Sequence, residues 1–163
     1  MKKIIAIFLC LAVSVSFFIF DTAAIEEKEF VPTVLEFELS TESNNTELEG
    51  IDAKATGLIN AYALSLEKTG TTLKIYGQTY ATGEVVKCGF KNLVIQRRAS
   101  SSDSWKDYYD YGDVYADGFA ANLSTTLSVA SGYQYRISCK HYAKKNILSV
   151  QTIANTSNIV TVS

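Results

Sequence analysis

Apolar residues recur at every second position after residue 50, which is the spacing of a β-strand that buries one of its two faces. Tyr62, Leu64 and Leu66 lie on one face of a first run. Leu73 and Ile75 repeat the pattern in the next run. Each run ends at a polar or glycine-containing cluster, such as KTGTT or ATGE, of the kind that forms turns. The period of two therefore predicts short strands joined by turns and argues against a helical fold.

About seven such runs follow one another between residues 51 and 163, at the short regular spacing of β-sandwich proteins. In the run VVKCGFKNLVIQRR the apolar phase shifts after Asn92, as a β-bulge would produce. The next run, WKDYYDYGDVY, follows the turn sequence ASSSDS, which predicts a hairpin. We expect an all-β domain over residues 51–163, built as an antiparallel β-sandwich.

The N-terminus has the three parts of a secretory signal. Lys2 and Lys3 precede an apolar run from Ile4 to Phe20, and two small residues end the segment at Ala24. Residues 1–24 are therefore predicted to be a signal peptide, and the protein to be secreted or held at the cell surface. An uncleaved membrane anchor is the alternative interpretation of the same run. Cleavage would leave one domain's worth of chain and no transmembrane span.

Charge is unevenly distributed along the rest of the chain. Residues 25–50 hold eight glutamates and one lysine, whereas residues 51–163 hold eight acidic and twelve basic residues. The acidic stretch is interpreted as a leader or linker, or as a pro-segment that covers the basic domain until it is removed. Within it, VLEFELS alternates apolar and acidic residues, which would also suit a single edge strand.

Two cysteines, Cys88 and Cys139, remain after the signal peptide. Each falls on the apolar face of its run, and an even number of cysteines in an exported domain predicts a disulfide. In reduced form the same pair could bind zinc together with His141. Five aspartates between Asp103 and Asp117 could suggest calcium, although their spacing is not that of an EF-hand loop. We predict the disulfide and no cofactor.

Two resemblances follow from specific segments. LSVASGYQYRI looks like the corner before the penultimate strand of immunoglobulin and fibronectin type III sandwiches, and Cys88, Trp105 and Cys139 follow the immunoglobulin order. This resemblance implies a tyrosine hydroxyl bonded to upstream backbone. GFKNLVIQRR, SWKDYYDY and YRISCKHYAKK resemble an uncharacterised family of small exported proteins of Gram-positive bacteria. That resemblance implies export and a single compact domain, and it transfers no activity.

The candidate binding surface combines aromatic and basic side chains. Aromatic residues concentrate in eleven positions, and basic residues follow in the run GYQYRISCKHYAKK. Exposed rings beside charged groups suit a glycan or a protein partner. The candidate residues are Trp105, Tyr108, Tyr109, Tyr111, Tyr115, Arg136, Lys140, Lys144 and Lys145.

The function expected from this sequence is a non-catalytic binding or cell-envelope module. Its partner would be a cell-wall polymer, a glycan or a protein, because the modest positive charge without a module signature argues against nucleic acid. The chain has a single histidine, His141, and no Gly-x-Ser-x-Gly motif for a serine nucleophile. One alternative is a small secreted effector or bacteriocin-like protein acting at membranes; another is a hydrolase with paired carboxylates.

Overall fold

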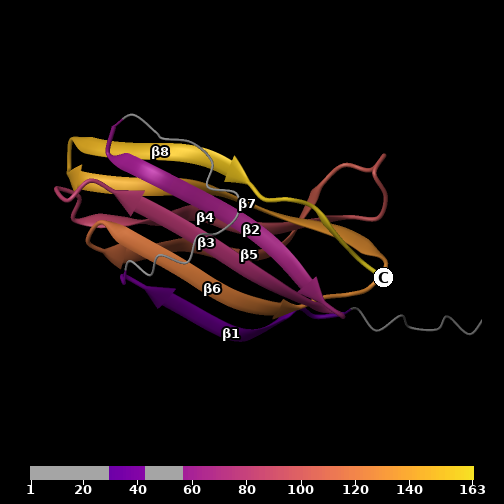
Figure 1. Ribbon diagram of the computed structural model, residues 1–163. Coiled ribbons are helices and arrows are strands. Elements are labelled where there is room, and N and C mark those ends of the chain that lie inside the picture. The colour runs from indigo at the N-terminus through magenta and orange to yellow at the C-terminus, as the bar shows by residue number, and fades with distance from the viewer. Residues whose placement is uncertain (1–29, 43–56) are drawn as a thin grey trace, which may run out of the picture.

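The computed structural model describes residues 30–42 and 57–163, which form nine β-strands and no helix (Figure 1). The strands are β1 (Thr33–Ser40), β2 (Ile59–Thr69), β3 (Thr72–Ala81), β4 (Lys87–Arg98), β5 (Lys106–Asp117), β6 (Ala120–Ser128), β7 (Tyr133–Asn146), β8 (Ser149–Thr156) and β9 (Val160–Val162). In this part of the chain there is consequently no apolar helix of membrane-spanning length. The predicted signal peptide, residues 1–24, lies outside the described residues.

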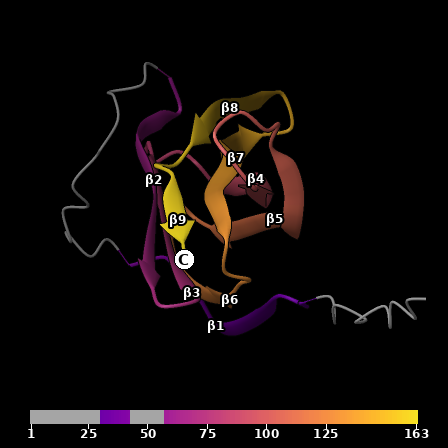
Figure 2. The ribbon, with the colours of Figure 1, turned by 90° about the vertical axis from the view of Figure 1, so that its right-hand side faces the viewer.

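The strands form two antiparallel sheets that face each other (Figure 2). Sheet A has the order β1-β6-β3-β2, and sheet B has the order β5-β4-β7-β8, with the short β9 also paired to β7. The predicted all-β architecture with antiparallel sheets is confirmed, but the described residues hold nine strands instead of about seven. One additional strand, β1, contains the VLEFELS segment and lies at an edge of sheet A.

The core lies between the two sheets, because alternate side chains of each strand point into this space. Phe90 of β4 is fully buried, and its ring occupies the space beside Gly77 of β3. A Cβ atom on Gly77 would lie 2.7 Å from Cε1 of Phe90, so the absence of a side chain there leaves room for the ring. The other large, fully buried apolar side chains are Ile59, Leu66, Leu73, Ile75, Leu93, Ile95, Leu127, Val129, Tyr135 and Ile137.

The irregularity predicted after Asn92 is a β-bulge in β4. The register of β4 against β5 shifts between Phe90 and Leu93, and both of these residues are fully buried although they are three positions apart. Asn92 has a φ of 51°, which asparagine tolerates better than most residues. Its backbone N–H donates to Oδ1 of Asp113 at 2.9 Å. The bulge keeps apolar residues on the core side before and after it.

The predicted disulfide is wrong, because Cys88 and Cys139 are both free and buried. They lie on β4 and β7, which are neighbours in the same sheet, and Cys88 is in register with Ala143. Cys139 is four residues along β7 from that position, which is roughly 13 Å of strand. A disulfide requires Cα atoms closer than about 7 Å. The alternation of apolar residues placed both cysteines on the inner face correctly but carried no information about register.

Candidate functional site

Four polar side chains meet on the outer face of sheet B, where β4 and β7 pair. Gln96 is in register with Arg136, and Arg98 is in register with Gln134. Because alternate residues of a strand share a face, these four side chains form one group on the surface away from the core. Nε of Arg98 donates to Oε1 of Gln134 at 2.8 Å, and Nε of Arg136 donates to Oε1 of Gln96 at 2.8 Å.

Trp105, immediately before β5, lies against this group. The guanidinium carbons of Arg98 and Arg136 are each 4.4 Å from the centroid of the Trp105 ring, within the range of cation–π contacts. The β4–β5 hairpin is shaped by Asp103, which accepts hydrogen bonds at 2.8 Å from the backbone N–H and the hydroxyl of Ser100. Trp105 is half-buried, so part of this residue remains open to solvent.

Arg97 lies on the inner face of β4, close to the same group of side chains. Its guanidinium carbon lies 4.4 Å from the ring centroid of Tyr108 and 4.6 Å from that of Tyr133. Both rings pack near the fully buried Tyr135, at centroid distances of 5.5 Å and 6.4 Å. The hydroxyl of Tyr135 donates to the backbone oxygen of Ala130 at 2.7 Å, which is the kind of bond implied by the immunoglobulin resemblance. Burial raises the pKa of Tyr135, so the phenol stays protonated as this donor.

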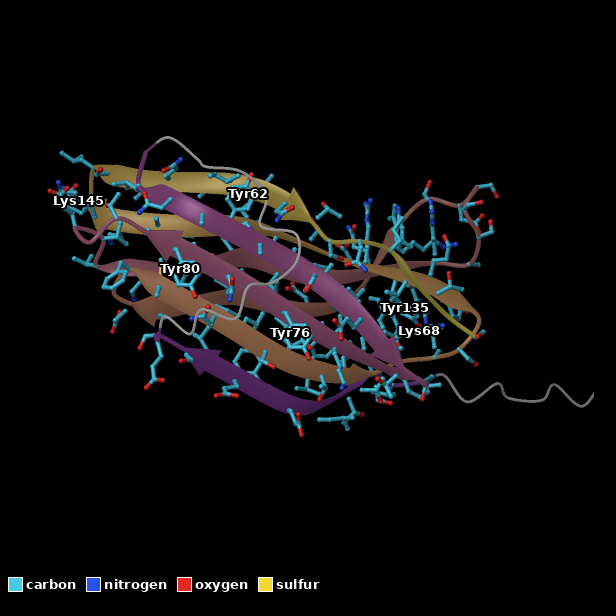
Figure 3. All side chains as sticks on the ribbon, in the orientation of Figure 1. Tyr62, Lys68, Tyr76, Tyr80, Tyr135 and Lys145 are labelled. Atoms are coloured by element: carbon cyan, nitrogen blue, oxygen red, sulfur yellow. The ribbon has the colours of Figure 1, made fainter. Side chains whose placement is uncertain are left out.

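The three arginines have no carboxylate partner among the described residues. The ion pairs in that part of the chain are Lys87–Asp117 and Lys145–Glu84, and neither involves an arginine. Burial, together with the positive charge of Arg98, lowers the pKa of Arg136. We name Arg97, Arg98, Trp105 and Arg136 the Trp105 cluster. It gathers positive charge and aromatic surface at one end of the molecule, near Tyr135 at the right of Figure 3.

The tyrosines of the β4–β5 hairpin region are distributed over both faces of sheet B. Tyr108, Tyr109 and Tyr111 are half-buried and pack against the core. Tyr115 lies on the outer face, where its ring centroid is 4.7 Å from that of Tyr142. Trp105 and Arg136 are thus the only two members of the predicted surface that belong to the Trp105 cluster.

The predicted lysines lie farther along β7. Lys140 is exposed on the outer face, four residues from Arg136. Lys144 and Lys145 precede the β7–β8 turn, and Lys145 lies at the opposite end of the molecule from Tyr135 (Figure 3). The nine candidate residues therefore do not form one surface. The sequence shows that Arg97 and Arg98 are basic, but not which rings they contact. The contact of Arg98 and Arg136 with Trp105 depends on the register of β4 and β7.

His141 belongs to a buried polar group that joins the two sheets. Thr79 of β3 donates its hydroxyl hydrogen to the backbone oxygen of Gly89 at 3.0 Å, so its oxygen accepts from Nδ1 of His141 at 2.8 Å. Nε2 then accepts from the side-chain amide of Asn155 at 3.2 Å. This assignment of the proton to Nδ1 follows from the hydrogen-bond network. The histidine thus connects β7 of sheet B with β3 of sheet A.

Cys139 and His141 are both uncharged at neutral pH. Sγ of Cys139 is 3.9 Å from Nε2 of His141, but burial raises the pKa of the thiol to about 12 and lowers that of the imidazole to about 4. A cysteine nucleophile needs the thiolate and access to substrate, whereas both of these side chains are buried.

The described residues contain no group of three histidine, cysteine or acidic side chains arranged to hold a metal ion. Comparison of the chain with protein-family models, with curated proteins and with solved structures gives no match.

Proposed function

We propose that this protein is an exported, non-catalytic binding module of the cell envelope and that the Trp105 cluster contacts an anionic group of its ligand. The observation that carries the proposal is the presence of three guanidinium groups around aromatic rings without a carboxylate partner in the described residues. An arginine presents several N–H donors in a plane and is suited to phosphate or carboxylate oxygens. An anionic ligand would supply the missing partner.

An immunoglobulin-like classification supports a binding role. The spatial order β2-β3-β6-β1 matches strands A, B, E and D of immunoglobulin domains, and β4-β7-β8 matches strands C, F and G. Here the place of strand D is taken by β1, which comes before strand A in the sequence. The bond from Tyr135 to Ala130 stands at the corner where such domains carry a conserved tyrosine contact. Ligand binding is a common task of this architecture, although a fold alone does not determine a function.

The ligand class follows from the chemistry of the cluster. Arg98 donates through Nε to Gln134 and through Nη1 to the backbone oxygen of Ser101, and phosphate groups would accept from the remaining N–H groups of Arg98 and Arg136. The exposed part of Trp105 would offer an apolar surface to a sugar or glycerol unit. A polymer that alternates these two kinds of group is the best match. Among the partners expected from the sequence, we therefore favour an anionic cell-wall polymer over a neutral glycan or a protein.

The test uses Trp105, which is the only tryptophan of the chain and so reports on its own surroundings. Addition of poly(glycerol phosphate) to the exported protein should change the fluorescence of this residue in a saturable way. Arg98→Gln and Arg136→Gln should each weaken binding by about tenfold, the effect expected for one charge-assisted hydrogen bond. Binding should also weaken as salt is added.

Lys140→Gln is the matched control for Arg136→Gln. Both substitutions remove one positive charge from the outer face of β7. Lys140→Gln should leave the affinity unchanged. An equal loss of affinity in Lys140→Gln and Arg136→Gln would show that binding depends only on the overall charge of the protein, and would contradict the proposal. Binding of a neutral glycan as tight as that of the anionic polymer would also contradict the proposal.

A second candidate function, contact with membranes, is favoured by the opposite end of the molecule. Ile147 and Leu148 in the β7–β8 turn are 85% and 94% exposed, and Val86 and Phe119 in neighbouring loops are more than half exposed. Backbone hydrogen bonds from Val86 to Lys144 and from Gly118 to Val86 hold these loops together. Exposed apolar tips beside lysines suit an anionic bilayer surface. Retention on phosphatidylglycerol vesicles that is lost in Ile147→Ser/Leu148→Ser, but kept in Arg98→Gln, would support this function instead.

A further inference from the structure

The N-terminal strand β1 is attached to the domain along one edge only. It pairs with β6 and with no other strand of the described chain. None of its eight residues is fully buried, and Glu36, Phe37 and Glu38 are exposed in the middle of the strand. Figure 2 shows β1 beside β6 at the free edge of sheet A. Strands held in this way are the least protected part of a sheet.

The apolar side chains of β1 nevertheless match the positions that they occupy beside β6. The half-buried Val34 and Leu39 pack against the core, in register with Leu127 and Leu123 of β6. The ring centroid of Phe37 lies 6.0 Å from that of Tyr111 on β5, so β1 also covers the open side between the two sheets. A strand that replaced β1 would need apolar side chains at the same positions. A second copy of this chain carries that strand.

The chain between β1 and β2 is much longer than its span requires. Residues 41–58 connect Ser40 to Ile59, and a chain of this length reaches roughly 60 Å when extended. The two strands lie at opposite edges of sheet A with two strands between them, a separation of roughly 15 Å. The excess length would allow β1 to pair with its own β6 or with that of a neighbouring molecule.

We propose that β1 exchanges between copies of this protein, so that β1 of one molecule completes sheet A of another. Every contact between β1 and β6 is reproduced in the exchanged form, because the two copies have the same sequence. The fraction of β1 strands that are exchanged then depends on two concentrations. One is the concentration of the protein, and the other is the effective concentration of β1 at its own β6. For a connection of about this length the effective concentration is on the order of millimolar. Exchange would join copies that are crowded together, as they would be on a surface that binds them.

Cysteines placed on the two strands would detect the exchange. Glu38 and Ser124 are directly opposite each other in the register of β1 and β6, and both are exposed. In the double variant Glu38→Cys/Ser124→Cys, mild oxidation should close a disulfide within one molecule, which tests the position of β1. The two single variants are then mixed and oxidised. A covalent heterodimer should form, with roughly half of the β1 strands exchanged near 1 mM protein and far fewer at micromolar concentrations.

The control replaces Glu67, an exposed residue of β2, by cysteine and mixes that variant with Ser124→Cys. This mixture measures disulfides formed by random collision. A heterodimer yield for Glu38→Cys that stays at the level of this control near 1 mM would show that β1 does not leave its own domain. Failure of the double variant to close its internal disulfide would overturn the proposal at its starting point, the pairing of β1 with β6.

Discussion

Replacing Phe90 by alanine is expected to lower the free energy of unfolding by about 3–5 kcal/mol, the usual effect of removing a buried phenylalanine ring. Phe90 is fully buried in β4 and fills the space that Gly77 leaves open in the facing sheet. Its ring also packs edge-on against His141, with 5.5 Å between the ring centroids. Removal of the ring would leave a cavity between Gly77 and His141. Denaturant unfolding of the two proteins measures the difference.

A double-mutant cycle shows whether the ring and Gly77 are directly coupled. Gly77→Ala alone should destabilise the protein by about 1–3 kcal/mol, because the new methyl group overlaps the Phe90 ring. In the Phe90→Ala background the same substitution should have a much smaller effect, since the ring is absent. Equal effects in both backgrounds would contradict the packing of Phe90 against Gly77.

Acidification is expected to destabilise the fold through His141. Burial lowers the pKa of this residue from 6.5 to about 4, so the unfolded chain binds a proton at a pH where the folded protein does not. Stability is therefore greatest above pH 6.5, falls as the pH decreases, and has lost about 3 kcal/mol from this residue once the pH is below 4. The loss comes from the cost of placing a charged imidazole between the two sheets.

His141→Gln provides the comparison, because glutamine retains an amide that can bond to Thr79 but does not ionise. The variant should lack the contribution of His141 to the pH dependence of stability, so the difference between the two proteins isolates this residue. Since the chain has one histidine, its titration can also be followed directly by NMR in the folded protein. A histidine that becomes charged near pH 6.5 without unfolding would contradict this prediction.

Local sequence patterns predicted most of the strands and one irregularity within them. The alternation in β2, β3 and β7 depends only on neighbouring residues, and the phase shift after Asn92 required a bulge wherever β4 was placed. The disulfide was predicted wrongly because strand pairing is not local. Immunoglobulin domains join cysteines of different sheets, whereas Cys88 and Cys139 occupy two strands of one sheet.

The candidate site was only partly predictable for the same reason. Trp105 and Arg136 are predictable from residue type, but nothing in the sequence assigns the tyrosines near Trp105 to a face of the sheet. The register shift near Gln96 in the pairing of β4 with β5 places Tyr108 and Tyr109 both toward the core, although they are adjacent in sequence. Arg98 meets Trp105 through pairings that join residues far apart in the sequence.

The central claim, that the Trp105 cluster is the contact surface for an anionic polymer, is tested most directly by NMR mapping on the isotope-labelled protein. The single indole N–H gives one resolved signal that belongs to Trp105. On addition of poly(glycerol phosphate), this signal and the backbone amides of residues 96–98 and 134–136 should shift together. Shifts confined to the β7–β8 turn and its lysines, with the indole signal unmoved, would contradict the claim.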